Sequence, residues 1–222
     1  WIPRCNSPSC CSPRWTKPSS TPRRRRTTIN NTTKIHNFEL RPRRSIPPEP
    51  IPIAANPMLN AFTVDVEDYF QVGAFADRIP TSRWDDYPHR VERNTQTVLD
   101  LLDRHQVRGT FFILGWTAHK FPDLVRDIQK AGHEIGSHSY WHQLIYEMTP
   151  EEFAEDLRLS CRVLEDITGQ RINMFRAPSF SITSQSLWAL DILAEEGIEF
   201  DSSIFPVHHD RYGIPDAEPF PY

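Results

Sequence analysis

The sequence predicts an α/β protein in which parallel strands form a barrel or part of one. From Ala61 onward, short apolar runs alternate with longer amphipathic stretches. Parallel neighbouring strands need a crossover, usually a helix, so this alternation indicates repeated βα units. The short runs are apolar on both faces, as in strands that are covered on both sides. Five such units within about 150 residues fit a (β/α) barrel.

The predicted strands are short runs of β-branched and aromatic residues bounded by glycine, proline or acids. In chain order they are AFTVDV (61–66), RGTFFILG (108–115), HEIGSH (133–138), INMFRAP (172–178) and IEFDSSIF (198–205).

The predicted helices are the amphipathic stretches between these strands, at 91–107, 121–132, 149–169 and 183–197. The third has the strongest boundary signals. Thr149 as N-cap, Pro150 at the first helical position and Glu152 three residues after the cap form a capping box. A glycine closes each of the last three helices.

Apolar residues at helical spacing define the face that each helix is expected to bury. These are Val91, Thr95, Val98, Leu101 and Leu102 in the first helix, Leu124, Val125 and Ile128 in the second, and Phe153, Leu157, Cys161 and Leu164 in the third. Because Cys161 falls within such a stripe, we interpret it as a core residue rather than a nucleophile.

Residues 1–57 differ in composition from the rest of the chain. They hold 11 prolines and 11 Lys/Arg against two acids, a net charge of +9, whereas residues 58–222 carry 14 Lys/Arg and 27 acids, a net charge of −13. The first segment shows no apolar periodicity and is predicted to be disordered. Its RRRR run at 23–26 is compatible with a nucleic-acid or nuclear-targeting patch, a transit peptide, or a solvated tail before a start at Met58. We favour the tail.

Charge and cysteine usage restrict the function classes for 58–222. The acidic balance argues against nucleic acid as the substrate of this domain. Cys161 is the only cysteine there, because Cys5, Cys10 and Cys11 lie in the tail. One cysteine cannot form a disulfide framework, so a reducing, cytoplasmic location is expected. No apolar run approaches the length of a membrane span.

The stretch after Phe205 is proline-rich and carries no periodic element. A parallel barrel left open at this point would expose a strand edge. We therefore expect a domain, 58–222, whose barrel is incomplete at its C-terminal end.

Polar side chains follow four of the five predicted strands. In parallel α/β folds the carboxyl ends of the strands surround one site. The residues expected there are Asp65, Glu67, Asp68, His138, His142, Arg176 and Asp201.

His138 and His142 are candidate metal ligands. Residues four apart on a helical turn face the same way, so both imidazoles can reach one ion. Imidazole and carboxylate ligands suit zinc, although the zincin helix signature is absent. The acids of DVED are alternatively a solvated strand end or a charge cluster at a helix N-terminus. Closely packed like charges need a cation or an arginine nearby, which a metal ion and Arg176 would supply.

Four motifs, TVDVED, HSYWH, RAPSF and FDSSIF, resemble in order and spacing those of the polysaccharide deacetylase family, also known as the NodB-homology or carbohydrate esterase family 4 proteins. They are most similar to the branch found in exopolysaccharide gene clusters. The resemblance covers about residues 61–222. It implies a distorted (β/α) barrel and metal-dependent removal of N-acetyl groups from hexosamine residues of a polysaccharide.

By that resemblance Asp65 is the expected catalytic base, and His138 and His142 are the expected ligands of a divalent metal, most simply zinc. The family pattern has two adjacent aspartates, whereas this chain has D-V-E-D. Glu67 and Asp68 therefore remain alternatives for the third ligand.

The same resemblance makes Arg176 the residue that orients the base, and Ser179 the donor of a backbone N–H to the oxyanion. Phe180 stands where the family usually has glycine. No Leu-x-His context for the family's general acid occurs, and His208 and His209 are interpreted as loop or substrate-rim residues. We accordingly expect little activity from the 222 residues taken alone.

Substrate contacts are expected from Tyr140, Trp141, Phe180 and Asp201, the first two by stacking on sugar rings, with core packing as the alternative. Three other functions remain open: a catalytically inactive carbohydrate-binding module, an amidase acting on a small non-peptide amide, and a nucleic-acid binder that uses the basic tail.

Overall fold

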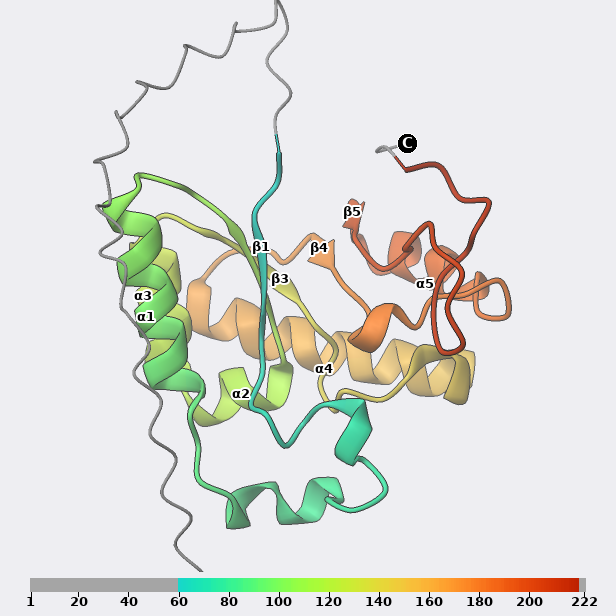
Figure 1. The fold of residues 1–222 in the computed structure, drawn as a ribbon, viewed down its shortest axis with the longest axis horizontal. Coiled ribbons are helices and arrows are strands. Elements are labelled where there is room, and N and C mark those ends of the chain that lie inside the picture. Colours follow the sequence, from blue (N-terminus) through green and yellow to red (C-terminus); the bar gives the residue numbers. More distant parts are fainter. Residues whose placement is uncertain (1–59, 220–222) are drawn as a thin grey trace, which may run out of the picture. The chain divides into compact units, whose positions relative to one another are not determined.

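A computed structural model describes residues 60–219, and the predicted tail with its RRRR run and three cysteines lies outside them. The described residues form one parallel five-stranded sheet in the order β1-β2-β3-β4-β5 (Figure 1). The strands are β1 (Thr63–Val66), β2 (Thr110–Ile113), β3 (Glu134–Ser137), β4 (Met174–Phe175) and β5 (Phe200–Asp201).

The sequential strand order identifies the type of α/β fold. Crossovers between parallel strands are right-handed, so an order that never reverses places successive helices on the same face of the sheet. A doubly wound sheet would instead reverse its order at a switch point. The prediction of a barrel-type α/β fold is therefore confirmed. The register places Asp65 beside Phe112, and Phe112 beside Gly136.

Five α-helices connect and cover the strands in the described part of the chain: α1 (Val91–Arg104), α2 (Gly115–Lys120), α3 (Pro122–Lys130), α4 (Pro150–Thr168) and α5 (Trp188–Glu195). Short 3₁₀ turns occur at Gly73–Phe75, Thr81–Asp86, Ile145–Glu147 and Pro178–Phe180. Helix α4 begins at the predicted capping box, in which Thr149 and Glu152 exchange side-chain and backbone hydrogen bonds. It ends at Gly169, whose φ of 66° is the left-handed conformation that glycine adopts most readily.

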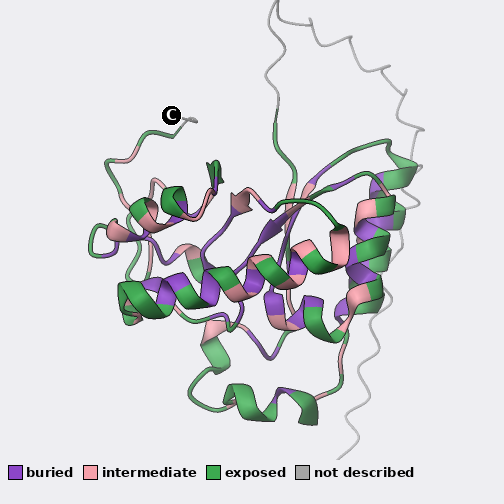
Figure 2. Ribbon diagram, turned by 180° about the vertical axis from the view of Figure 1, so that it is seen from behind, coloured by how far each residue is buried: buried purple, intermediate pink, exposed green. Residues whose placement is uncertain are grey.

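Three apolar clusters form the core of the described residues. One joins β1 and β2 to α1 and α3, another joins β4 to α4 and α5, and a small third one consists of Phe70, Trp84 and Leu114. Cys161 on α4 packs against the first two. Burial raises the pKa of its thiol to about 12, so the reactive thiolate is scarce at neutral pH and the interpretation as a core residue holds. Figure 2 shows the buried stripe along α4. The expected cytoplasmic location stays a prediction.

Several boundaries and faces differ from the sequence expectations. In α1 the buried residues are Val91, Thr95, Leu99 and Leu102, whereas Leu101 is exposed, so its assignment to the inner face was wrong. Because Leu101 and Leu102 are adjacent, either of them could belong to the apolar stripe of the helix. Packing against β1 and β2 buries Leu102 and leaves Leu101 exposed.

Helix α2 was not predicted, because its GWTAHK sequence is short and begins with glycine. Among the described helices, none is both long enough and apolar enough to span a membrane.

Candidate metal centre and active site

The carboxyl ends of β1 and β3 bring together three of the predicted metal ligands. Glu67 follows β1, His138 follows β3, and His142 lies four residues further along the same loop. One ligand atom from each of them lies within 4.8 Å of the others. The Glu67 Oε2 atom is 2.7 Å from His142 Nε2 and 4.0 Å from His138 Nε2.

His138 is held in a form that suits metal binding. Its Nδ1 lies 2.8 Å from the carbonyl oxygen of Arg176, so Nδ1 carries the proton and donates it to that oxygen. The lone pair of Nε2 then faces Glu67. Burial lowers the pKa of His138 below its ordinary value, so the ring is neutral at pH 7.

Glu67 presents an unsatisfied oxygen to the two histidines. Its Oε2 is buried and has no hydrogen-bond partner assigned among the described residues, although His142 Nε2 lies 2.7 Å away. Burial would raise the pKa of this carboxyl, but the neighbouring His142 and His138 together outweigh that effect, and the pKa lies below its ordinary value. Two imidazole nitrogens and one carboxylate around a buried, unpaired oxygen fit a divalent metal ion and leave a coordination position open.

The sequence predicted that the two histidines share one helical turn, and this prediction was wrong. Residues 138–144 form a loop in which Ser139 and His142 adopt positive φ values of 66° and 57°. The imidazoles meet because the loop folds back on itself. The Ser139 hydroxyl accepts a hydrogen bond from the His142 backbone N–H, at 3.2 Å.

Asp156 on α4 anchors this loop and was missed by the sequence analysis. Its buried carboxylate accepts hydrogen bonds from the backbone N–H groups of Tyr140, at 2.7 Å, and Trp141, at 3.1 Å. Burial raises its pKa despite these two donors. Asp156 could have been noticed in the sequence because it is an acid placed beside the buried stripe of Phe153 and Leu157 on the same helix.

We expect Asp156→Ala to weaken metal binding by about 10–100-fold, as is usual when a group that positions a ligand is removed. The change leaves the backbone N–H groups of Tyr140 and Trp141 without their acceptor, so the loop that carries His142 loses its anchor. Metal affinity measured by competition with a chelator checks this. Glu155→Ala, an exposed neighbour on the same helix, is the matched control, and equal affinities in the two variants would contradict the assigned role.

Asp68 lies outside the group of Glu67, His138 and His142, which is called the metal group below. Its Oδ2 accepts hydrogen bonds from the backbone N–H groups of Arg90, at 2.8 Å, and Val91, at 3.3 Å. Its Oδ1 accepts one from Tyr69 at 3.1 Å. The carboxylate therefore caps the N-terminus of α1, where backbone donors and the helix dipole favour a negative charge. Of the two acids, Glu67 is the one that lies with the histidines and is the candidate third ligand, and the charge-cluster interpretation applies to Asp68.

Asp68→Ala is expected to lower the free energy of unfolding by about 2 kcal/mol, because buried backbone donors lose their acceptor. Its metal stoichiometry should equal that of the wild type. Urea unfolding and elemental analysis measure the two quantities. Asp103→Ala, an exposed acid on α1, should be neutral in both. Loss of metal from Asp68→Ala with unchanged stability would show that the ligand assignment is reversed.

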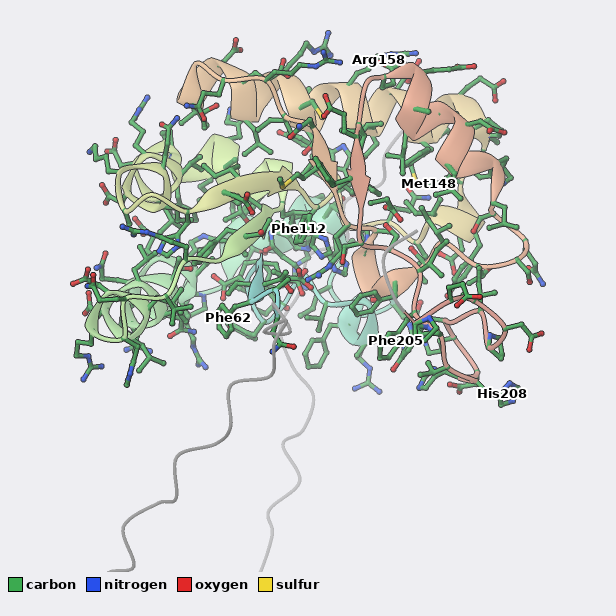
Figure 3. All side chains as sticks on the ribbon, turned by 90° about the horizontal axis from the view of Figure 1, so that it is seen from above. Phe62, Phe112, Met148, Arg158, Phe205 and His208 are labelled. Atoms are coloured by element: carbon green, nitrogen blue, oxygen red, sulfur yellow. The ribbon has the colours of Figure 1, made fainter. Side chains whose placement is uncertain are left out.

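Arg176 joins the end of β4 to β1 and β5. Its Nη1 donates to Asp65 Oδ1 at 2.9 Å, and its Nη2 donates to the hydroxyls of Thr63, at 2.9 Å, and Ser202, at 2.8 Å. The guanidinium also lies 4.3 Å from the ring centroid of Phe112, which Figure 3 labels among the central strands.

Thr63 and Ser202 were not predicted. Thr63 could have been found, since it lies two residues before Asp65 in a strand and therefore faces the same side. Together these contacts hold the Asp65 carboxylate in one orientation, with 31% of its side chain exposed.

Ser179 and Phe180 form a strained turn after β4. Ser179 has φ 52° and ψ 29°, and Phe180 has φ 52°. These values lie in the left-handed region, which is uncommon for a bulky residue and where glycine is unstrained. The Phe180 ring stacks on Phe205 at a centroid distance of 5.3 Å.

The two aromatic residues proposed for sugar stacking differ in exposure. Tyr140 is 7% exposed, and its ring packs so closely on Gly115 that a side chain there would come within 2.5 Å of it. Tyr140 is thus a packing residue, and of the two alternatives given for it, core packing is the one that its burial favours. Trp141 is 41% exposed and lines a cavity of about 620 Å³ that also reaches His142.

The remaining predicted positions lie near the carboxyl edge of the sheet or in the loop beyond it. Asp201 at the end of β5 accepts hydrogen bonds from the backbone N–H and the hydroxyl of Ser203. His208 and His209 are exposed in the loop after Phe205, and Figure 3 shows His208 at its outer edge.

The chain has a parallel α/β fold whose strands follow one another in sequential order. Its strand ends bring together two histidines, a glutamate and an arginine-paired aspartate. These features define a class of barrel proteins that carry a divalent-metal site. The chain belongs to the polysaccharide deacetylase family, whose sequence profile matches residues 77–199, more than half of the 222 residues.

Several peptidoglycan deacetylases match part of the chain. A peptidoglycan-N-acetylglucosamine deacetylase of Bacillus cereus is 29% identical over 120 residues, which are 49% of this chain and 44% of that protein. A peptidoglycan-N-acetylmuramic acid deacetylase of Bacillus subtilis is 32% identical over 91 residues, or 41% and 35%. The chain thus spans less than half the length of these relatives.

A solved structure agrees with the fold. A Mycobacterium smegmatis protein assigned as a polysaccharide deacetylase shares 34% identity at a TM-score of 0.52. The match covers 65% of this chain and 50% of that one.

Proposed function

We propose that this chain provides a metal-dependent hydrolase site that removes N-acetyl groups from hexosamine residues of a polysaccharide. The observation that carries the proposal is the juxtaposition, at one edge of the sheet, of the Glu67–His138–His142 group with an aspartate held by Arg176. Converging metal-ligand atoms on one side and a carboxylate base on the other are what amide hydrolysis by activated water requires.

Glu67, His138 and His142 would hold the metal, and the two-nitrogen, one-carboxylate set supports zinc. A bound zinc ion would lower the pKa of water and polarise the acetyl carbonyl. Asp65 accepts the proton of the attacking water. Arg176 pairs with the Asp65 carboxylate, and its hydrogen bonds with the hydroxyls of Thr63 and Ser202 hold the guanidinium in place.

The backbone N–H of Ser179 would donate to the oxygen on which negative charge develops. The left-handed turn at Ser179 and Phe180 sets the direction of this group. The exposed ring of Trp141 would bind one face of a sugar in the cavity that leads to His142. The resemblance of the motifs to the branch found in exopolysaccharide gene clusters would make the polymer an exopolysaccharide.

The test is acetate release from N-acetylglucosamine oligosaccharides by the metal-loaded chain, followed with a coupled acetate assay and by mass spectrometry of the freed amine. Release that requires both metal and Asp65 is expected. Binding of the oligosaccharide without any release would favour a carbohydrate-binding module. Release only from small amides would favour an amidase.

A further inference from the structure

The cavity next to the metal group carries one cation that the proposed reaction does not use. Aromatic rings of Phe70, Trp84 and Trp141 form part of its lining, and His142 connects it to the metal group. Its charged lining residues, apart from that histidine, are Asp77, Glu147 and Arg211. The volume of about 620 Å³ falls in the usual range for ligand pockets.

Arg211 reaches this cavity across the backbone of Gly73. A side-chain carbon placed on Gly73 would lie 3.4 Å from Arg211 Nη2 and 3.7 Å from Ser179 Oγ. The guanidinium and the Ser179 side chain therefore lie against the same small patch of backbone. Arg211 forms no salt bridge with any acid of the described residues, although Asp77 and Glu147 line the same cavity.

The loop that carries Arg211 is internally braced. The backbone N–H of Ile214 donates to the carbonyl oxygen of Phe205 at 2.9 Å and closes the loop. Gly213 has φ 101°, and a side chain there would come within 2.2 Å of the Val207 carbonyl oxygen. This position therefore requires glycine.

Aromatic packing attaches this loop to the strained turn. Tyr212 stacks on His209 at 3.9 Å and packs at 6.1 Å from Phe180, between ring centroids. The residue next to Arg211 is thus fixed against the turn that carries Ser179, so the exposed Arg211 is held at the cavity that His142 also lines.

We propose that Arg211 determines substrate specificity by binding a carboxylate on the saccharide next to the N-acetyl group that is removed. A guanidinium presents two parallel N–H donors that match a carboxylate, and such charged pairs are stronger than neutral hydrogen bonds. Asp77 and Glu147 repel a carboxylate from the rest of the cavity, so the acidic group is accepted only where Arg211 reaches it. The identity of the saccharide as N-acetylated rests on the proposed function.

Two saccharide types supply this chemistry. The carboxylate belongs either to a hexuronic acid adjacent to the hexosamine, or to a lactyl ether on the hexosamine itself. The probes are a hyaluronan tetrasaccharide, in which glucuronate alternates with N-acetylglucosamine, and a disaccharide of N-acetylglucosamine and N-acetylmuramic acid. N-acetylchitotetraose is the neutral reference.

The experiment measures dissociation constants by calorimetry with the full metal-loaded chain carrying Asp65→Asn, so that the probes are not consumed. One acidic probe is expected to bind more tightly than the neutral one. Arg211→Gln should weaken that probe about tenfold and leave the neutral probe within about twofold. Arg78→Gln, which removes an exposed cation outside the cavity, is the matched control and should change neither.

Arg211→Lys keeps the charge without the planar donor pair, and an intermediate affinity for the acidic probe is expected. This variant also serves if Arg211→Gln fails to fold. Equal affinity of acidic and neutral probes, or an equal loss for both in the Arg211 variants, would overturn the inference. A failure of the proposed function instead appears as absence of acetate release by the unmutated chain while acidic probes still bind in an Arg211-dependent way.

Discussion

Glu67→Ala and His138→Ala are each expected to abolish stoichiometric metal binding, and acetate release should be lost with it. Each change removes one of the three converging ligand atoms, and two protein ligands are too few to hold the ion tightly. The measurement is metal content by elemental analysis after dialysis against a weak chelator, with near one ion per chain expected in the unmutated protein.

Asp68→Ala is the control for both variants, because Asp68 is an adjacent buried acid whose carboxylate caps α1. It should retain the ion. Equal stoichiometric metal in the unmutated protein and in His138→Ala would refute the metal centre. Retention of metal by Glu67→Ala with loss of metal from Asp68→Ala would show that Asp68, and not Glu67, is the third ligand.

Asp65→Asn is expected to lower the turnover number by about 10²–10⁴-fold while metal content stays unchanged. The amide keeps the shape of the carboxyl group and can still accept from Arg176 Nη1, but it cannot accept the proton of water. Turnover on N-acetylglucosamine oligosaccharides and elemental analysis, made on the same preparation, separate the base from the ligands.

Two further variants measure how much Arg176 contributes to turnover. Arg176→Met removes the charge and all side-chain hydrogen bonds, and a loss of turnover comparable to that of Asp65→Asn is expected. The bond from His138 Nδ1 goes to the Arg176 backbone carbonyl, so metal should be retained. Ser202→Ala removes one of the two hydroxyls that accept from Nη2 and should have a much smaller effect. Full turnover in Asp65→Asn would exclude this aspartate as the base.

Much of the fold was predictable because its signals are local. The capping box of α4, the glycine after it and the apolar stripe of Phe153, Leu157 and Leu164 all lie within one helix length. The convergence of Asp65, His138 and Arg176 was also predictable, since carboxyl ends of parallel strands meet at one edge.

The errors share a physical origin in contacts between distant segments. Tyr140 and Trp141 are equivalent aromatic residues in the sequence, and packing on Gly115 buries only the first. Asp156 was missed because the loop it anchors is 15 and 16 residues away. In α1, the choice between Leu99 and Leu101 depends on which side of the helix faces β1 and β2.

The sequence by itself determined the family, the parallel α/β architecture and the set of residues from which the candidate metal centre and its proposed base are drawn. Only the tertiary structure decided between the two acids after Asp65. Residues that follow one another at a strand end point in different directions, so Glu67 and Asp68 cannot both face the histidines. Asp68 turns toward the N-terminus of α1, whose backbone N–H groups lie 22 and 23 residues along the chain, and Glu67 is left to meet His138 and His142.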